Sequence, residues 1–141
     1  MKVLLAAAAA ALGALLIAGP TQAQQPAPAP SLQPAPVKRT PLGKVEVPGS
    51  DQEVIFGMVE IAPGFKAGRH SHPGTVIGYI IEGEFWLALD GQPERIVKTG
   101  ESVEIRDKAI HNEGNASGDK PLKFLVVYVV EKGKPLVQPV Q

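Results

Sequence analysis

The chain has 141 residues with 14 basic and 14 acidic side chains, and it contains no cysteine. A balanced charge without a basic cluster argues against nucleic acid as a partner. The lack of cysteine excludes disulfides, thiol chemistry and thiolate metal sites. Stability must therefore come from packing, from a bound metal or from oligomerisation.

The N-terminal segment has the pattern of a secretory signal. Lys2 precedes an apolar run over residues 3–18, and small residues at Thr21 and Ala23 follow a Gly-Pro break. We predict a signal peptide over residues 1–23, cleaved after Ala23, and a periplasmic or secreted mature protein without a membrane anchor. A retained anchor is the alternative, but the run falls short of the ~20 residues that span a bilayer.

Residues 24–41 are rich in Pro, Ala and Gln and carry six prolines. This composition favours extended chain without regular hydrogen bonding, so we predict a disordered linker there. Such an arm acts as a spacer or reaches a binding partner. We expect one folded domain over residues 42–132 and a C-terminal tail over residues 133–141.

The domain has the pattern of short strands separated by turn residues. A hairpin signal occurs at Asp90-Gly91, and helical periodicity is absent after the signal segment. We expect residues 99–100 and 112–120 to form loops. The predicted strands are residues 44–47, 54–61, 79–82, 84–89, 94–98, 102–105 and 122–130.

Many short strands with regular turns indicate an all-β sandwich or a closed barrel, and the pattern alone does not choose between them. The run over residues 124–130 is apolar at every position. We therefore expect a strand that is covered on both faces.

Three histidines are the only ones in the chain: His70, His72 and His111. Side chains alternate across a strand, so His70 and His72 would face the same side with Cα atoms about 6.5 Å apart. Two imidazoles at that spacing can converge on one ion at about 2.1 Å each. A His-x-His pair alone is a weak signal, and His111 is the candidate third ligand.

The spacing around these histidines resembles the two motifs of the cupin family. The first motif is matched by Gly64, His70, His72 and Gly83, and the second by Gly100, His111 and Asn115. The resemblance covers residues 54–130 and is to small single-domain cupins of the quercetin-dioxygenase-like type. It implies a cupin jelly-roll β-barrel, or double-stranded β-helix, with one divalent metal inside. It also implies a homodimer.

The chain departs from the family pattern at three positions. Val76 stands where the family has a glutamate ligand, which leaves three neutral imidazoles. Arg106 and Lys108 replace the Pro and Gly of the second motif. We interpret these two cations as solvated loop charges, with anion recognition as the alternative.

Three neutral ligands leave an ion its full charge and leave positions open for water or substrate. We predict a metal-dependent, dioxygenase-like enzyme acting on a small organic molecule, with Fe, Zn, Mn, Ni or Cu as the ion. A Lewis-acid isomerase, lyase or hydrolase fits the same residues. A non-catalytic metal-binding or ligand-binding module also fits them, as does a degenerate barrel without metal.

The sequence assigns no catalytic residues. Glu82 and Glu84 bracket Gly83 at a strand end, and we interpret them as exposed turn carboxylates. We expect the aromatic side chains of Tyr79 and Trp86 to pack rather than to line a pocket.

Overall fold

The computed structural model describes residues 35–141. The predicted signal peptide and linker residues 24–34 lie outside these described residues. No helix within residues 35–141 is long and apolar enough to cross a membrane. The described residues form ten strands: β1 (Val37–Glu46), β2 (Gln52–Ile61), β3 (His70–Ser71), β4 (Gly74–Glu82), β5 (Glu84–Leu89), β6 (Arg95–Lys98), β7 (Ser102–Ile105), β8 (His111–Asn115), β9 (Leu122–Glu131) and β10 (Gln138–Pro139).

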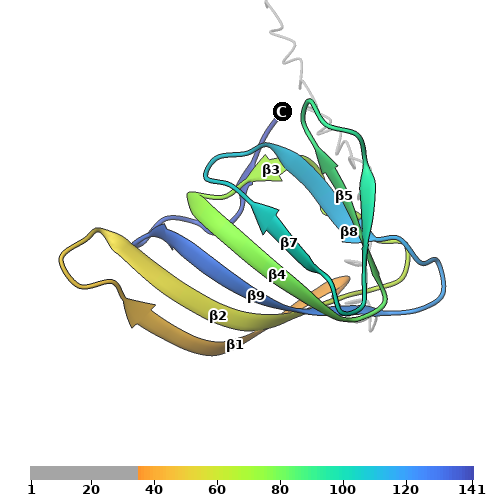
Figure 1. Ribbon diagram of the computed structural model, residues 1–141, viewed down its shortest axis with the longest axis horizontal. Coiled ribbons are helices and arrows are strands. Elements are labelled where there is room, and N and C mark those ends of the chain that lie inside the picture. The colour runs from red at the N-terminus through yellow and green to blue at the C-terminus, as the bar shows by residue number, and fades with distance from the viewer. Residues whose placement is uncertain (1–34) are drawn as a thin grey trace, which may run out of the picture. The chain divides into compact units, whose positions relative to one another are not determined.

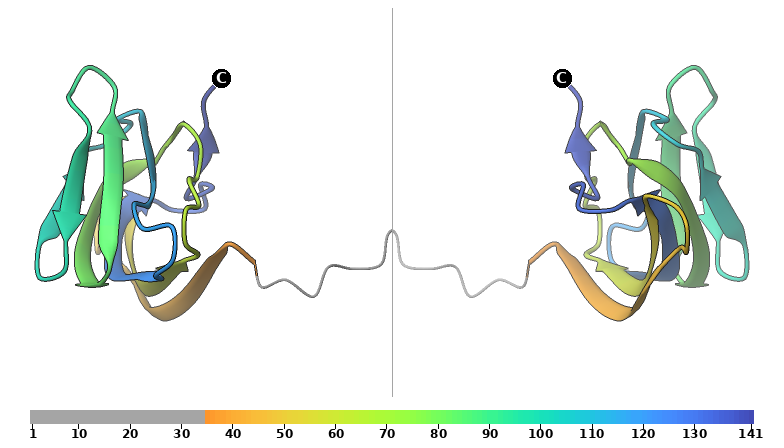
Figure 2. Two further views of the ribbon diagram at one scale, coloured as in Figure 1. Left: turned by 90° about the vertical axis from the view of Figure 1, so that its right-hand side faces the viewer. Right: turned by 90° about the vertical axis from the view of Figure 1, so that its left-hand side faces the viewer.

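The strands form two five-stranded antiparallel sheets, with the orders β1-β2-β9-β4-β7 and β10-β3-β8-β5-β6. We call them the first and the second sheet. They face each other and enclose the apolar core (Figure 1, Figure 2). Phe85 of the second sheet meets Phe124 of the first edge-on, with ring centroids 5.2 Å apart. The predicted all-β jelly-roll fold is confirmed.

Strand β9 lies at the centre of the first sheet, between β2 and β4. Its burial alternates strictly: Leu122 and every second residue after it are buried, and the residues between them are half-buried. The prediction that both faces are fully covered is therefore wrong. The inner face packs into the core, while the outer face of the first sheet is only partly shielded from solvent.

The first strand starts earlier than the sequence predicts. Residues 37–41, assigned to the linker, belong to β1 and pair with β2 in a ladder that is interrupted between Pro41 and Gly43. An edge strand accepts a proline because one side of its backbone forms no ladder. At the other end of the chain, the predicted tail contains β10, which pairs with β3.

The segment 112–120 is not a continuous loop, since residues 111–115 form β8 between β3 and β5. Its Asn-Glu-Gly-Asn sequence has low intrinsic preference for a strand, and the two neighbouring strands override that preference. Strand β4 likewise begins at Gly74, well before the predicted start at residue 79.

Gly74 lets the chain pass directly from the histidine segment into β4. Its φ is 155°, and a Cβ at this position would lie 2.1 Å from the Val129 carbonyl oxygen and 2.7 Å from the Val130 Cα. Any side chain here would push β4 away from β9.

We therefore predict that Gly74→Ala lowers the free energy of unfolding by about 3 kcal/mol, through overpacking and backbone strain. Urea denaturation of the metal-free protein measures this loss. Gly118→Ala is the matched control, because no atom lies within 4 Å of the Cβ it would add. Equal effects of the two substitutions would contradict the proposed close approach.

Candidate metal centre

The three histidines meet inside the barrel. His70 pairs directly with His111 across the β3–β8 ladder, and His72 follows β3. Their side-chain nitrogens include one from each ring that all lie within 4.8 Å of one another. His70 is 3% exposed, His72 is 2% exposed and His111 is fully buried at 0%. The structure thus brings together the three ligands that the sequence predicts, in a group that could hold a metal ion.

A backbone carbonyl fixes each imidazole. The Nδ1 atoms of His70, His72 and His111 lie 2.8, 2.6 and 2.9 Å from the carbonyl oxygens of Gly68, Leu136 and Ala109. A carbonyl oxygen only accepts, so each Nδ1 carries the proton and donates it. Each Nε2 therefore keeps its lone pair, which is the form that binds a metal.

The Nε2 of His111 is buried and has no hydrogen-bond partner among residues 35–141. An unpaired buried acceptor is unfavourable unless a ligand satisfies it. Burial also lowers the pKa of all three imidazoles, and that of His72 falls to about 4. The neutral state needed for coordination thus prevails at neutral pH, and the three residues fit a divalent ion.

Val76 lies where the family pattern has its carboxylate ligand. It is 5% exposed and belongs to the buried apolar core. With His72 it borders a cavity of about 10 Å³, the space of a single water-sized sphere. The remaining lining residues are Gly78, Phe85, Val103, Ile105, Glu113, Phe124, Val126 and Tyr128.

Glu113 is a site residue that the sequence analysis missed. Its Oε2 lies 3.7 Å from the His111 Nε2, and its side chain is 13% exposed. Burial raises the pKa of this carboxyl to about 7, while Arg39 acts in the opposite direction. Glu113 follows His111 by two residues, so strand alternation would have found it, had residues 112–120 not been assigned to a loop.

Tyr128 and Arg39 connect the histidines to the surface. The Tyr128 ring meets His72 edge-on at 5.6 Å between centroids. Burial and the neighbouring Glu113 raise the pKa of Tyr128, and Arg39 opposes this shift. Tyr128 also borders an apolar cleft of about 180 Å³ together with Arg39 and Leu136. The same tyrosine thus lines both the inner cavity and the outer cleft.

The turn that replaces the family's Pro-x-Gly motif keeps its backbone shape. Lys108 has a φ of 57°, a left-handed conformation that glycine adopts at less cost. Its backbone N–H donates to the His72 carbonyl oxygen at 3.1 Å. The Lys108 side chain is exposed, as is that of Arg106, which lies 3.4 Å from Glu104. Both side chains therefore match the predicted solvated charges.

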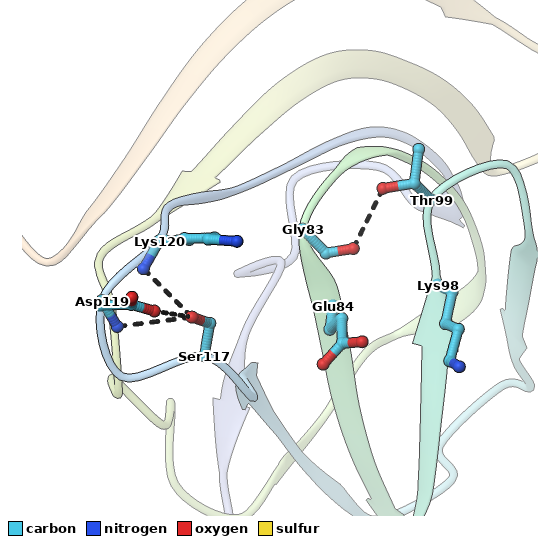
Figure 3. A pocket seen from close by; sticks show the side chains of 7 residues that line it. All are labelled: Gly83, Glu84, Lys98, Thr99, Ser117, Asp119 and Lys120. Atoms are coloured by element: carbon cyan, nitrogen blue, oxygen red, sulfur yellow. Dashed lines mark hydrogen bonds between the residues drawn. The ribbon is translucent and has the colours of Figure 1, made fainter.

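The predicted turn carboxylates lie away from the histidines. Glu82 and Glu84 are exposed. Glu84 borders an open surface pocket with Lys98 and Lys120, as Figure 3 shows. Leu89 of β5 pairs with His111, so this pocket lies beyond the opposite end of β5. It does not belong to the metal centre.

The two aromatic residues that we expected to pack do not line the cavity. Tyr79 is 50% exposed on the outer face of the first sheet, so the expectation that it packs is wrong. Trp86 points away from the core, with the Lys66 ammonium 3.6 Å from its ring centroid and its Nε1 donating to Glu94.

The comparison with known families agrees with this geometry. The model of the cupin domain matches residues 57–128, which is more than half of the chain. The chain belongs to the cupin family. The match includes all three histidines, Val76 and Glu113.

This cupin is similar to an oxidoreductase that contains a cupin domain. It is 31% identical over 83 residues to the cupin-domain-containing oxidoreductase virC of Hypocrea virens, a match that covers 59% of this chain and 42% of virC. The chain thus spans less than half the length of that relative.

Two solved structures have the same fold. A cupin-like protein from Thermotoga maritima has a TM-score of 0.60 and 27% identity, over 74% of this chain and 75% of that one. The polyketide cyclase RemF from Streptomyces resistomycificus has a TM-score of 0.59 and 26% identity, over 75% and 72%.

The buried Glu113 should make the stability of the metal-free protein depend on pH. Its pKa is higher in the folded protein than the usual 4.5. The contribution of Glu113 to the free energy of unfolding is therefore fully present below about pH 4.5 and is lost as the pH rises to about 7. The histidine pKa values are lowered, so their contribution is present above pH 6.5 and is lost as the pH falls.

Glu113→Gln removes only the first of these two effects. We predict that the free energy of unfolding of the variant, relative to that of the wild type, rises by about 3 kcal/mol from pH 4.5 to pH 8. Urea denaturation of both metal-free proteins at the two pH values measures the gain. Glu104→Gln, which changes an exposed carboxylate, should differ from the wild type by less than about 0.5 kcal/mol at either pH. A pH-independent effect of Glu113→Gln would contradict a raised pKa.

Proposed function

We propose that this cupin is an exported, metal-dependent enzyme that oxidises a small organic molecule with dioxygen at His70, His72 and His111. The observation that carries the proposal is the buried set of three neutral imidazoles, each with its Nε2 lone pair available. A bound divalent ion would supply Lewis acidity there and, in the case of iron, electron transfer to dioxygen.

The residues around the histidines support chemistry rather than storage of an ion. Glu113 places a carboxyl group 3.7 Å from the His111 Nε2, in the same cavity as His72. Tyr128 adds a phenol that meets His72 edge-on. A carboxyl group and a phenol thus lie beside the three histidines, within an otherwise apolar cavity.

The cleft supports a small and largely apolar substrate. It holds about 180 Å³ and is lined by the side chains of residues such as Val59, Val126 and Leu136. Arg39 stands at the same cleft and supplies its one cation. The names of similar proteins, an oxidoreductase and a polyketide cyclase, are consistent with a small organic substrate.

Measuring dioxygen consumption and the incorporation of its oxygen atoms tests the proposal directly. Both atoms of dioxygen enter the product in such a reaction, so the substrate supplies the electrons and no separate reductant is needed. We predict that the protein loaded with Fe(II) under anaerobic conditions consumes dioxygen, once it is admitted, with an enolisable β-diketone or with a thiol. Mass spectrometry after reaction under ¹⁸O₂ should find both labelled atoms in the products.

The zinc-loaded protein and His111→Ala are the controls. Zinc has no redox chemistry, so the zinc form should consume no dioxygen. His111→Ala should lose both bound iron and turnover, since its side chain supplies one of three ligands. Unchanged iron content in His111→Ala would refute the proposed triad.

A binding module without turnover is the second candidate function. The observation that favours it is the small inner cavity, which leaves little space beside the histidines until a side chain moves. Stoichiometric metal and ligand binding without dioxygen consumption over the whole substrate panel would favour this candidate.

We further propose that the protein is a homodimer that packs through the outer face of the first sheet. Phe56, Ile77 and Tyr79 are 37%, 47% and 50% exposed on that face. They are continuous with the half-buried Leu125 and Val127 of β9, because the ladders align Phe56 with Val127 and Ile77, and Leu125 with Tyr79. Such a patch is self-complementary when a two-fold axis passes through it.

Ile77→Lys should convert this dimer to a monomer by placing a charge at the centre of the patch. Sedimentation velocity of the mature protein measures the change. Arg95→Glu, which reverses an exposed charge on β6 of the second sheet, should leave the dimer intact. A wild-type protein that sediments as a monomer would refute the proposal.

A further inference from the structure

The three histidines alone would not balance the positive charge of a bound divalent ion. Three neutral imidazoles leave a divalent ion with two uncompensated positive charges in a site where all three ligands are nearly inaccessible to water. A buried charge without an anionic partner is costly. Val76, at the position of the family's carboxylate, provides no compensation.

Glu113 lies where it can supply the missing charge. His111 and Glu113 are two residues apart on β8, so their side chains leave the same face of the strand. The ladder of β8 with β5 continues through both residues, aligning His111 with Leu89 and Glu113 with Leu87. The backbone on which the carboxylate stands is therefore fixed by the second sheet.

The distance between the two side chains agrees with shared coordination. Two donors that are each about 2.1 Å from one ion lie about 3 to 3.5 Å apart, for angles between 90° and tetrahedral. The Glu113 Oε2 and the His111 Nε2 are 3.7 Å apart. A movement of a few tenths of an ångström, which rotation of the glutamate side chain provides, brings both into one coordination sphere.

No competing ion pair holds the carboxylate elsewhere. Within residues 35–141, no lysine or arginine nitrogen lies within 4.0 Å of the Glu113 carboxylate, and it pairs only with His111, which is neutral. Arg39 acts on it electrostatically without forming a close ion pair. The Nε2 of His111, its nearest neighbour in that pair, is itself without a hydrogen-bond partner. Both atoms are therefore free to turn to the same ion.

We propose that Glu113 is the fourth protein ligand of the metal centre. The carboxylate that the family pattern takes from the position of Val76, on the first sheet, comes here from β8 of the second sheet. This inference rests on the proposed metal binding. It converts an all-imidazole site into one with three nitrogens and one oxygen, and it lowers the net charge of the occupied site from two to one.

Cobalt(II) binding to the mature protein tests the proposal, because the visible absorption of cobalt reports its ligands and coordination number. We expect Glu113→Gln to raise the cobalt Kd by at least 100-fold and to change the position and intensity of the absorption bands. Denaturation of the metal-free variant verifies that it is folded. Glu104→Gln is the matched control and should keep the wild-type Kd and spectrum.

The spectrum separates a ligand from a supporting residue. A residue that only orients a ligand also alters metal affinity, by about 10- to 100-fold, but leaves the set of coordinating atoms unchanged. A wild-type spectrum in Glu113→Gln would therefore overturn the proposal whatever the Kd. A wild-type protein that binds no cobalt would instead refute the metal centre itself.

A second variant restores the carboxylate on the opposite wall. Val76 lines the same cavity as Glu113 and His72, so Val76→Glu can offer an oxygen from β4. We expect Val76→Glu in the Glu113→Gln background to recover at least 10-fold of the lost cobalt affinity. A double variant that folds, yet binds cobalt no better than Glu113→Gln, would contradict a shared coordination position.

Discussion

The site depends on three hydrogen bonds from imidazole Nδ1 atoms to backbone carbonyl oxygens. Two of these bonds are local, because Gly68 and Ala109 each precede their histidine by two residues. The third joins His72 to Leu136, 64 residues further along the chain. The C-terminal segment reaches this point because β10 pairs with β3. The orientation of the His72 ring therefore depends on the pairing of β10 with β3.

Holding these groups inside the barrel is costly, and the rest of the domain has to offset that cost. Three imidazoles and one carboxylate lie in surroundings that shift their pKa values towards the neutral forms. The compensation comes from the apolar inner faces of both sheets, where side chains such as Ile80, Phe85 and Leu122 are almost completely buried. The packing of the core thus offsets the cost of burying these polar groups.

The sequence predicted those parts of the site that short-range spacing determines. His70 and His72 face one side because strands alternate, and motif spacing placed His111 beside them. Glu113 escaped because its strand has little intrinsic β preference and forms only through pairing with β3 and β5. Arg39 and Leu136 escaped for the same physical reason: they lie in segments whose composition predicts a linker and a tail, and only long-range pairing orders them.

Because the Glu113 carboxyl group comes from the second sheet, the two sides of the site differ in polarity. His70, His111 and Glu113 belong to β3 and β8 of the second sheet, while Val76, Val126 and the ring of Tyr128 belong to β4 and β9 of the first. A carboxylate at Val76 would have made the first sheet polar next to the histidines. With valine there, His70, His111 and Glu113 lie on the second sheet, and the wall formed by the first sheet is apolar apart from the phenol of Tyr128. Val126 and Tyr128 of the first-sheet wall also border the apolar cleft, so the two spaces are separated by these two side chains alone on that side.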